Sequence, residues 1–299
     1  ITGSNGKTIV KEWLFQLLSP SMAVTRSPRS YNSQIGVPLS VWLLSEQTQV
    51  GVFEAGISQP GEMAALRDII QPTVGVITNI GSAHQENFNT LDEKVEEKLK
   101  LFHDTDVIIY PADDPTIARC VAAGNYTGRH MAWSQKDPDA PLYISRIDKS
   151  GSETKISYIY NKGESQTYTL PFIDEASVEN SITCLAVCLT LGLAAERIDE
   201  GMANLEPVAM RLEVKQGQHG CTLINDSYNS DINSLDIALD FISRRPDHKG
   251  RRRTLILSDI PQSGLAKEQL YREVSDLCVK RGVEKFIGVG KDLMSEAAS

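Results

Sequence analysis

The chain begins Ile1-Thr2-Gly3-Ser4-Asn5-Gly6-Lys7-Thr8, and an apolar helical pattern follows directly. Glycines let backbone N–H groups approach phosphate oxygens closely, and the N-terminus of the following helix adds a dipole that favours anions. Lys7 is then placed to reach the outer phosphates of a nucleotide, and the Thr8 hydroxyl to bind Mg²⁺. The spacing Gly-x-x-Gly-Lys-Thr is two residues shorter than the common phosphate loop. We therefore predict a nucleotide phosphate site; the alternative is a plain strand–helix turn.

Downstream of this loop, short β-branched runs alternate with helical patterns. Strands are expected at residues 50–53, 74–78 and 107–110, and helices at 61–70 and 91–102. This alternation is typical of a parallel sheet covered by helices. Such sheets place their ligand sites beyond the carboxyl ends of the strands, so side chains that directly follow these strands are candidates for function.

The pattern changes after residue 142. Two runs in which polar and apolar residues alternate, 155–160 and 166–170, flank the turn sequence Asn161-Lys162-Gly163. They indicate an antiparallel hairpin added to the parallel sheet. A helix is then expected over residues 177–193, with Ser177 as its N-cap.

A second α/β pattern begins near Pro207, with strands expected at 221–224, 254–257 and 286–289. The fold class is therefore α/β. Length and pattern together predict two domains, at residues 1–205 and 206–299. We expect that the strand before the phosphate loop is cut from the first domain and that the second domain is incomplete.

Composition excludes several classes of protein. The formal net charge of −9 disfavours non-specific nucleic-acid binding, and the basic cluster at 249–253 is expected to be a solvated loop. No run approaches eighteen apolar residues, so no membrane-spanning helix is indicated. Cys184 and Cys188 stand four apart in an apolar helical pattern and are expected in the core rather than on a metal. Five cysteines without CxxC spacing suit a reducing cytoplasm.

Three further side chains stand out by position. Glu54 directly follows the strand at 50–53 and could hold a metal ion near the phosphates, or be an exposed loop acid. His84 lies beyond the strand at 74–78, although a lone histidine is more often a surface residue. Lys98 falls in the middle of the apolar face of its helix. It must be paired, neutral or modified, unless only its stem lies on apolar surface while the amine reaches water.

In order and spacing, these residues resemble the Mur ligase family. The matching stretches are the loop at 2–8, Glu54-Ala55-Gly56, Asn79-Ile80 with Ala83-His84, Lys98, Asn180, Arg211 within 207–213, and residues 225–231. The last two stretches and residues 32–38 look like the branch that adds D-alanyl-D-alanine to UDP-N-acetylmuramoyl tripeptide. Residues 30–34 and 225–234 look most similar to versions fused to a C-terminal alanine racemase.

The resemblance implies a three-domain, ATP-dependent ligase of peptidoglycan precursor synthesis, and so of cell-wall biogenesis, cell shape and cell division. A UDP-sugar domain would precede Ile1, residues 1–205 would bind ATP, and a Rossmann-like domain that binds the dipeptide would begin at 206. The 299 residues alone are then expected to be inactive. They contain no racemase segment, although a fused racemase domain is a possible partner downstream.

The resemblance also implies the site residues. The phosphates of ATP would be bound by Gly3, Ser4, Asn5, Gly6, Lys7 and Thr8, and the rest of the nucleotide would contact Asn180, Arg211 and Asp226. Mg²⁺ would be held by Thr8, Glu54, His84 and a carbamylated Lys98. The catalytic set would be Lys7, His84, Lys98 and Arg211.

Two departures and two alternatives accompany this assignment. Ala176 stands where family members often carry a histidine that contacts the nucleotide, and Ile9 where threonine is frequent.

A folylpolyglutamate synthase-like ligase shares the short loop, but residues 225–231 argue against it. A nucleotide-binding module that no longer ligates would not be expected to keep Glu54, His84 and Lys98.

Overall fold

A computed structural model describes residues 1–81, 87–124, 126–209, 211–227, 230–244, 250–261, 263 and 265–296. The chain divides into two compact units. The first comprises Ile1–Ile80 and Phe88–Glu206, and the second comprises Gly81–Asn87 and Pro207–Ser299. None of the helices in these described ranges is long and apolar enough to cross a membrane.

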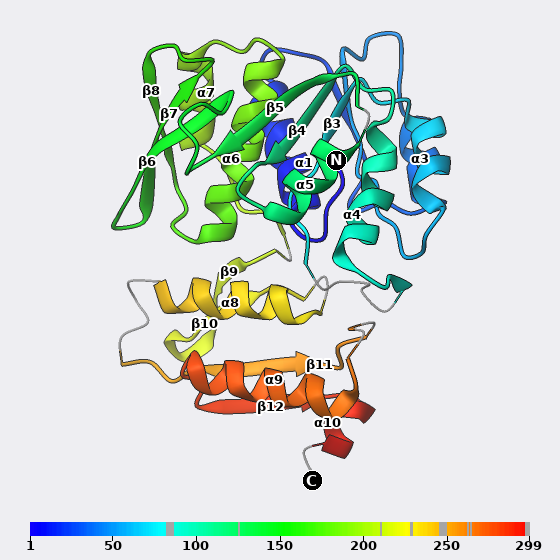
Figure 1. Cartoon of the computed structure of the whole chain (residues 1–299). Helices are drawn as coiled ribbons and strands as arrows, with labels where there is room; N and C mark the ends of the chain where they lie inside the picture. The colour runs from blue at the N-terminus through cyan, green and yellow to red at the C-terminus, as the bar shows by residue number, and fades with distance from the viewer. Residues whose placement is uncertain are drawn as a thin grey trace. The chain divides into compact units, whose positions relative to one another are not determined.

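The first unit is built on a six-stranded sheet (Figure 1). Its strands, in spatial order, are β3 (Val74–Val76), β4 (Val107–Pro111), β5 (Arg129–Ser134), β6 (Leu142–Ser150), β7 (Glu153–Tyr160) and β8 (Ser165–Leu170). The pairs from β3 to β6 are parallel and the last two pairs are antiparallel. The predicted α/β class with a parallel sheet is therefore confirmed.

A second parallel pair, β1 (Val24–Arg26) and β2 (Val50–Val52), is connected to this sheet by the start of the chain. The amide of Ala55 donates to the carbonyl of Ile1 at 2.8 Å, and the amide of Thr2 donates to the carbonyl of Val76 at 2.8 Å. Residues 1–2 thus lie between β3 and the residues that follow β2. The phosphate loop begins at the carboxyl ends of these strands.

Helices pack in two groups. The first group is α1 (Lys7–Leu18), α6 (Glu175–Thr190) and α7 (Ala195–Ala203). The second is α2 (Gly36–Val41), α3 (Glu62–Ile70), α4 (Leu91–Leu99) with the 3-10 turn η2 (Lys100–Phe102), and α5 (Pro115–Ala123). The second group shares one core with β3 and β4, in which Leu66, Ile77, Val95, Leu99 and Ile108 are fully buried.

Helix α6 begins earlier than predicted. Its N-cap is Asp174, whose carboxylate accepts a hydrogen bond from the amide of Ser177 at 2.8 Å. Ser177 as N-cap is therefore wrong: a carboxylate three residues upstream satisfies the orphan amide first. Cys184 and Cys188 on this helix are fully buried, as predicted.

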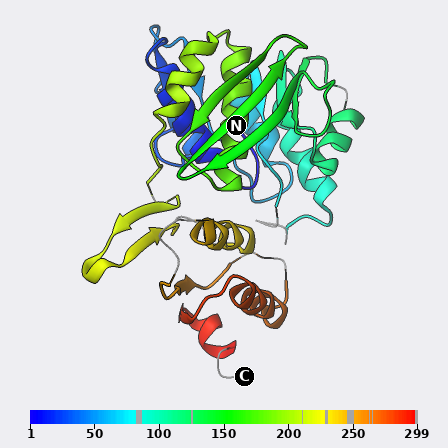
Figure 2. The same ribbon diagram turned by 90° about the vertical axis from the view of Figure 1, so that its left-hand side faces the viewer.

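The antiparallel end of the sheet has one strand more than the predicted hairpin. The hairpin itself is β7–β8, and its turn residues Asn161 and Lys162 both have positive φ, as a type I′ turn requires. The added strand β6 pairs parallel with β5 and antiparallel with β7, and so joins the two kinds of sheet. Figure 2 shows these green strands facing the viewer.

The second unit contains two two-stranded sheets. The antiparallel pair is β9 (Glu213–Gln216) with β10 (Thr222–Asn225), joined through the 3-10 turn η3 (Gln218–Gly220) and yellow in Figure 2. The parallel pair is β11 (Thr254–Ser258) with β12 (Lys285–Val289). The helices are α8 (Ile232–Arg244), α9 (Lys267–Lys280) and α10 (Lys291–Glu296). They share a separate core that includes Leu239, Leu257, Leu270 and Val274.

Candidate nucleotide and metal site

Both glycines of the phosphate loop have conformations and surroundings that exclude a side chain. Gly3 has φ 136°, and a Cβ there would lie 2.0 Å from the Thr78 hydroxyl. Gly6 has φ 83°, and a Cβ there would lie 2.3 Å from the Asn180 side-chain oxygen. Gly6 is also the N-cap of α1, so no side-chain oxygen caps this helix end. The loop therefore presents backbone and a helix N-terminus, the surroundings that anions prefer.

The end of β3 holds the loop in place. The Asn79 side-chain oxygen accepts a hydrogen bond from the amide of Asn5 at 2.9 Å, and its carbonyl accepts one from the amide of Ser4 at 2.8 Å. The Thr78 hydroxyl donates to the carbonyl of Asn5 at 2.6 Å. Sequence reasoning treated Thr78 only as the end of a strand; its contact with the loop depends on pairing across 73 residues.

Two lysines converge on the loop. Lys7 Nζ donates to the carbonyls of Gly3 at 2.8 Å and Ser4 at 2.9 Å. Lys98 Nζ donates to the carbonyl of Gly3 at 3.4 Å, and Lys98 is only 4% exposed, so its amine does not reach water. Burial holds the pKa of Lys98 well below its ordinary value of 10.5; the charges of Lys7 and Lys94 lower it further, and Glu97 opposes them.

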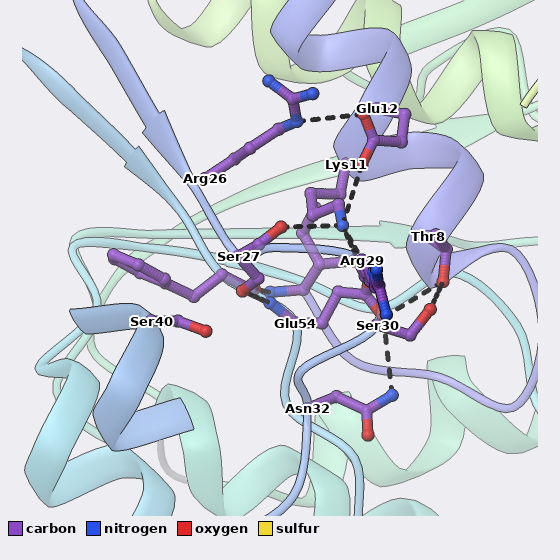
Figure 3. A network of polar contacts seen from close by, with 12 residues as sticks. Thr8, Lys11, Glu12, Arg26, Ser27, Arg29, Ser30, Asn32, Ser40 and Glu54 are labelled. Atoms are coloured by element: carbon purple, nitrogen blue, oxygen red, sulfur yellow. Dashed lines mark hydrogen bonds and ion pairs between the residues drawn. The ribbon is translucent and has the colours of Figure 1, made fainter. Parts of the chain in front are cut away.

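The predicted metal ligands Thr8 and Glu54 are in direct contact (Figure 3). The Thr8 hydroxyl donates to Glu54 Oε2 at 3.2 Å, and the Asn32 amide group lies 3.4 Å from the same oxygen. The Ser30 hydroxyl lies 3.0 Å from that of Thr8. Glu54 is fully buried, which excludes an exposed loop acid.

A residue that sequence reasoning missed completes this cluster. Lys11 on α1 is fully buried, and its Nζ lies 3.2 Å from Glu54 Oε1. It stands three residues after Thr8 and four after Lys7, and these spacings put side chains on one helix face. This spacing is visible in the sequence, but the helix was predicted from the apolar residues on its other face.

The remaining predicted residues lie in three places. Asn180, 5% exposed on α6, faces Gly6. Arg211 and Asp226 belong to the second unit, where Asp226 accepts a hydrogen bond from the amide of Leu212 at 3.2 Å. Burial raises the pKa of Asp226, while the Leu212 hydrogen bond and the charge of Arg211 act in the opposite direction. His84 lies outside the described residues.

The donor set fits a hard divalent cation beside phosphates. Thr8, Ser30 and Glu54 offer only oxygen, which Mg²⁺ prefers, and one carboxylate is common in sites where phosphates supply the other ligands. Within the described residues, no hydrogen bond reaches Glu54 Oε1, although it is buried and ion-paired. The same part of the chain holds no group of three or more His, Cys, Asp or Glu that could bind a metal ion without oxygen ligands from phosphates or hydroxyls.

Comparisons with known proteins bear on the family and the fold of the chain. The Mur ligase middle domain matches residues 1–188. The chain is 27% identical over 297 residues to UDP-N-acetylmuramoyl-tripeptide–D-alanyl-D-alanine ligase of Bacillus subtilis, covering 97% of this chain and 62% of that protein. It therefore spans less than two thirds of the length of this relative.

Solved structures show the same arrangement of elements. MurF from Acinetobacter baumannii superposes with a TM-score of 0.84 at 25% identity, over 99% of this chain and 64% of that one. MurF ligase from Thermotoga maritima in complex with ADP has a TM-score of 0.80 at 22% identity, over 98% of this chain and 70% of that one. The second likeness establishes the fold.

Proposed function

Because the chain belongs to the Mur ligase family, we propose that it carries the ATP-binding core of a ligase that adds D-alanyl-D-alanine to UDP-N-acetylmuramoyl tripeptide. The observation that carries the proposal is the buried Thr8–Glu54 contact beside a loop in which a side chain at Gly3 or Gly6 would be strained and crowded. The Bacillus subtilis relative is named for its action on UDP-N-acetylmuramoyl tripeptide and D-alanyl-D-alanine, which supports these substrates over a folate substrate. Residues 1–205 would be the ATP-binding domain, and 206–299 part of the dipeptide-binding domain.

The chemistry requires activation of a carboxylate, which is a poor electrophile. A carboxylate oxygen of the tripeptide attacks the γ-phosphorus of ATP, the bond to ADP breaks, and an acyl phosphate forms. The dipeptide amine then attacks the acyl carbon, phosphate leaves, and the amine loses a proton. Such transfers depend on alignment and on neutralisation of the phosphate charge. Mg²⁺ would supply part of that neutralisation.

The residues of the loop would align the phosphates. Lys7 would exchange the carbonyls of Gly3 and Ser4 for phosphate oxygens, since an ammonium binds an anion more strongly than a carbonyl. Thr8 and Glu54 would hold Mg²⁺, and His84 would help to place a second ion. Asn180, Arg211 and Asp226 would contact the nucleotide, with Arg211 also stabilising negative charge in the transition state.

Lys98 would act as a carbamate. A lysine with a lowered pKa keeps more of its amine neutral, and a neutral Nζ can attack carbon dioxide and lose a proton to give an anionic carbamate. The carbamate would replace a buried ammonium, which repels Lys7 and Lys94, by oxygens that attract both lysines and bind Mg²⁺.

The proposal extends to the whole protein. A fused alanine racemase domain would supply D-alanine for the dipeptide, as residues 30–34 and 225–234 suggest. A cytoplasmic location is supported by the cysteines, all five of which are free.

Phosphate release by the full-length protein tests the proposal. Release should require both UDP-N-acetylmuramoyl tripeptide and D-alanyl-D-alanine; release that ignores the dipeptide, or that follows folate and glutamate instead, contradicts it. Binding of ADP with no release at all would favour a non-catalytic module. Lys98→Ala should abolish release even with added bicarbonate, whereas Lys100→Ala, at the next lysine along the chain, which is half-exposed, should not. Full activity of Lys98→Ala would contradict the carbamate.

A further inference from the structure

The Lys11 ammonium connects three separate elements at the base of the site (Figure 3). From α1, Nζ donates to the carbonyl of Ser27 at 2.9 Å and to the carbonyl of Arg29, both in the segment after β1. It also lies 3.0 Å from Glu12 Oε1 and 3.2 Å from Glu54 Oε1, at the end of β2. Lys11 and Glu54 have fully buried side chains, so solvent screening, which makes surface ion pairs weak, does not apply here.

These contacts outnumber the hydrogens of Lys11. An ammonium has three donors, and the carbonyls of Ser27 and Arg29 take two of them. Glu54 Oε1 is attracted by the charge, yet within the described residues it accepts no hydrogen bond. Its lone pairs are therefore available to a cation, while the other oxygen, Oε2, is held by Thr8 and Asn32.

The charges around Lys11 alternate in sign from the surface inward. Arg26, about one-third exposed, lies 2.9 Å from Glu12 Oε2, and Glu12 lies beside Lys11, which lies beside Glu54. Glu12 thus offsets the ammonium from the outer side. Lys11 therefore has a carboxylate on each side, that of Glu12 toward the surface and that of Glu54 in the interior.

We propose that Lys11 is the positioning residue of the cation site: it orients the Glu54 carboxylate, while its hydrogen bonds to the carbonyls of Ser27 and Arg29 hold Nζ in place. This inference rests on the proposed function, because it assumes that Glu54 binds a divalent cation. Lys11 acts through Glu54 and touches neither nucleotide nor substrate. Lys11→Met should therefore weaken cation binding without a comparable effect on metal-free nucleotide binding.

Mn²⁺ binding to the full-length protein in the presence of ADP, followed by electron paramagnetic resonance, measures this effect. Lys11→Met should lower Mn²⁺ affinity about 10-fold or more, the range found when partners of metal ligands are removed. ADP affinity in EDTA should stay within about twofold, because Lys7 and the glycine loop are unchanged. Lys149→Met, which breaks the solvent-exposed ion pair with Glu175 in the same unit, is the matched control and should match wild type.

The Glu54→Gln variant distinguishes a positioning role of Lys11 from a general disturbance of the structure. If Lys11 acts through the carboxylate, Lys11→Met should change Mn²⁺ affinity less than about twofold once Glu54 is already Gln. An equal loss in both backgrounds, or wild-type affinity in Lys11→Met alone, overturns the inference. If Lys11→Met does not fold, Lys11→Gln keeps an N–H donor for the Ser27 carbonyl without the charge, and wild-type Mn²⁺ affinity in that variant overturns it equally. Wild-type protein that binds no Mn²⁺ with ADP would instead sink the proposed function.

Discussion

Lys98 shows at the residue scale how burial changes the chemistry of a common side chain. Its amine faces the carbonyl of Gly3 and two other lysines, so the charged form is disfavoured in the folded protein. The helical pattern alone left two outcomes open, an amine in water or an amine that is paired, neutral or modified. The structure places the amine against the phosphate loop.

The lowered pKa of Lys98 predicts a pH-dependent stability. Between the lowered pKa and 10.5, the unfolded state binds the proton and the folded state does not, so stability rises with pH in that window. In buffer free of carbon dioxide, Lys98→Met should therefore melt at a higher temperature than wild type at neutral pH. The gap should shrink as the pH approaches 10.5. Thermal denaturation at several pH values measures it, and a constant gap would refute the prediction.

Gly6 is the residue at which backbone conformation and close contact act together. Gly6→Ala should abolish ADP binding, since the new Cβ meets Asn180 in addition to the strain of a positive φ, about 1–3 kcal/mol. Gly151→Ala, with φ 61° and open space around it, is the control for strain alone and should bind ADP normally. Titration of ADP by calorimetry compares the two, and equal affinities would show that the Asn180 contact does not matter.

At the scale of the secondary-structure elements, the N-terminus of α3 is capped by a side chain from another helix. The side chain of Glu97, only 3% exposed, reaches from α4 to the start of α3, where Oε1 accepts hydrogen bonds from the amides of Gly61 at 2.8 Å and Met63 at 3.2 Å. It is a helix cap supplied by another helix, and it adjoins Lys98 in the chain. The alternating pattern of the sequence identifies both helices but not this connection.

Glu97→Ala should destabilise the first unit. The buried amide of Met63 and the part-buried amide of Gly61 would lose their acceptor, and a buried group left unsatisfied costs about 1–3 kcal/mol. Glu96→Ala, the exposed neighbour, should change the free energy of unfolding by no more than about 0.5 kcal/mol. Urea unfolding of both variants gives the values, and a similar small change in each would count against the capping role.

Two units with separate cores define the whole molecule. The loop, Glu54, Lys98 and Asn180 all belong to the first unit, whereas Arg211 and Asp226 belong to the second. Each unit buries its own apolar cluster. We therefore expect the first unit to bind nucleotide phosphates without the contacts that the second unit would add.

Residues 1–206 should fold alone and bind ADP with Mg²⁺, because every proposed phosphate ligand lies in the first unit. The affinity should be lower than that of the whole protein, since the proposed contacts from Arg211 and Asp226 are removed. Circular dichroism and ADP titration test this. A shortened protein that is folded but binds no ADP would show that the second unit contributes to the phosphate site itself.

The sequence by itself determined the glycine loop, the α/β alternation, the hairpin and its turn, because each depends on residues close together in the chain. It also supported the family resemblance through the spacing of its motifs. Only the tertiary structure decided that Asp174 rather than Ser177 caps α6, that Asn180 faces Gly6, and that Lys11 pairs with Glu54. Thr8 and Glu54 stand 46 residues apart, and their contact exists because parallel strands and α1 bring distant segments to one edge of the sheet.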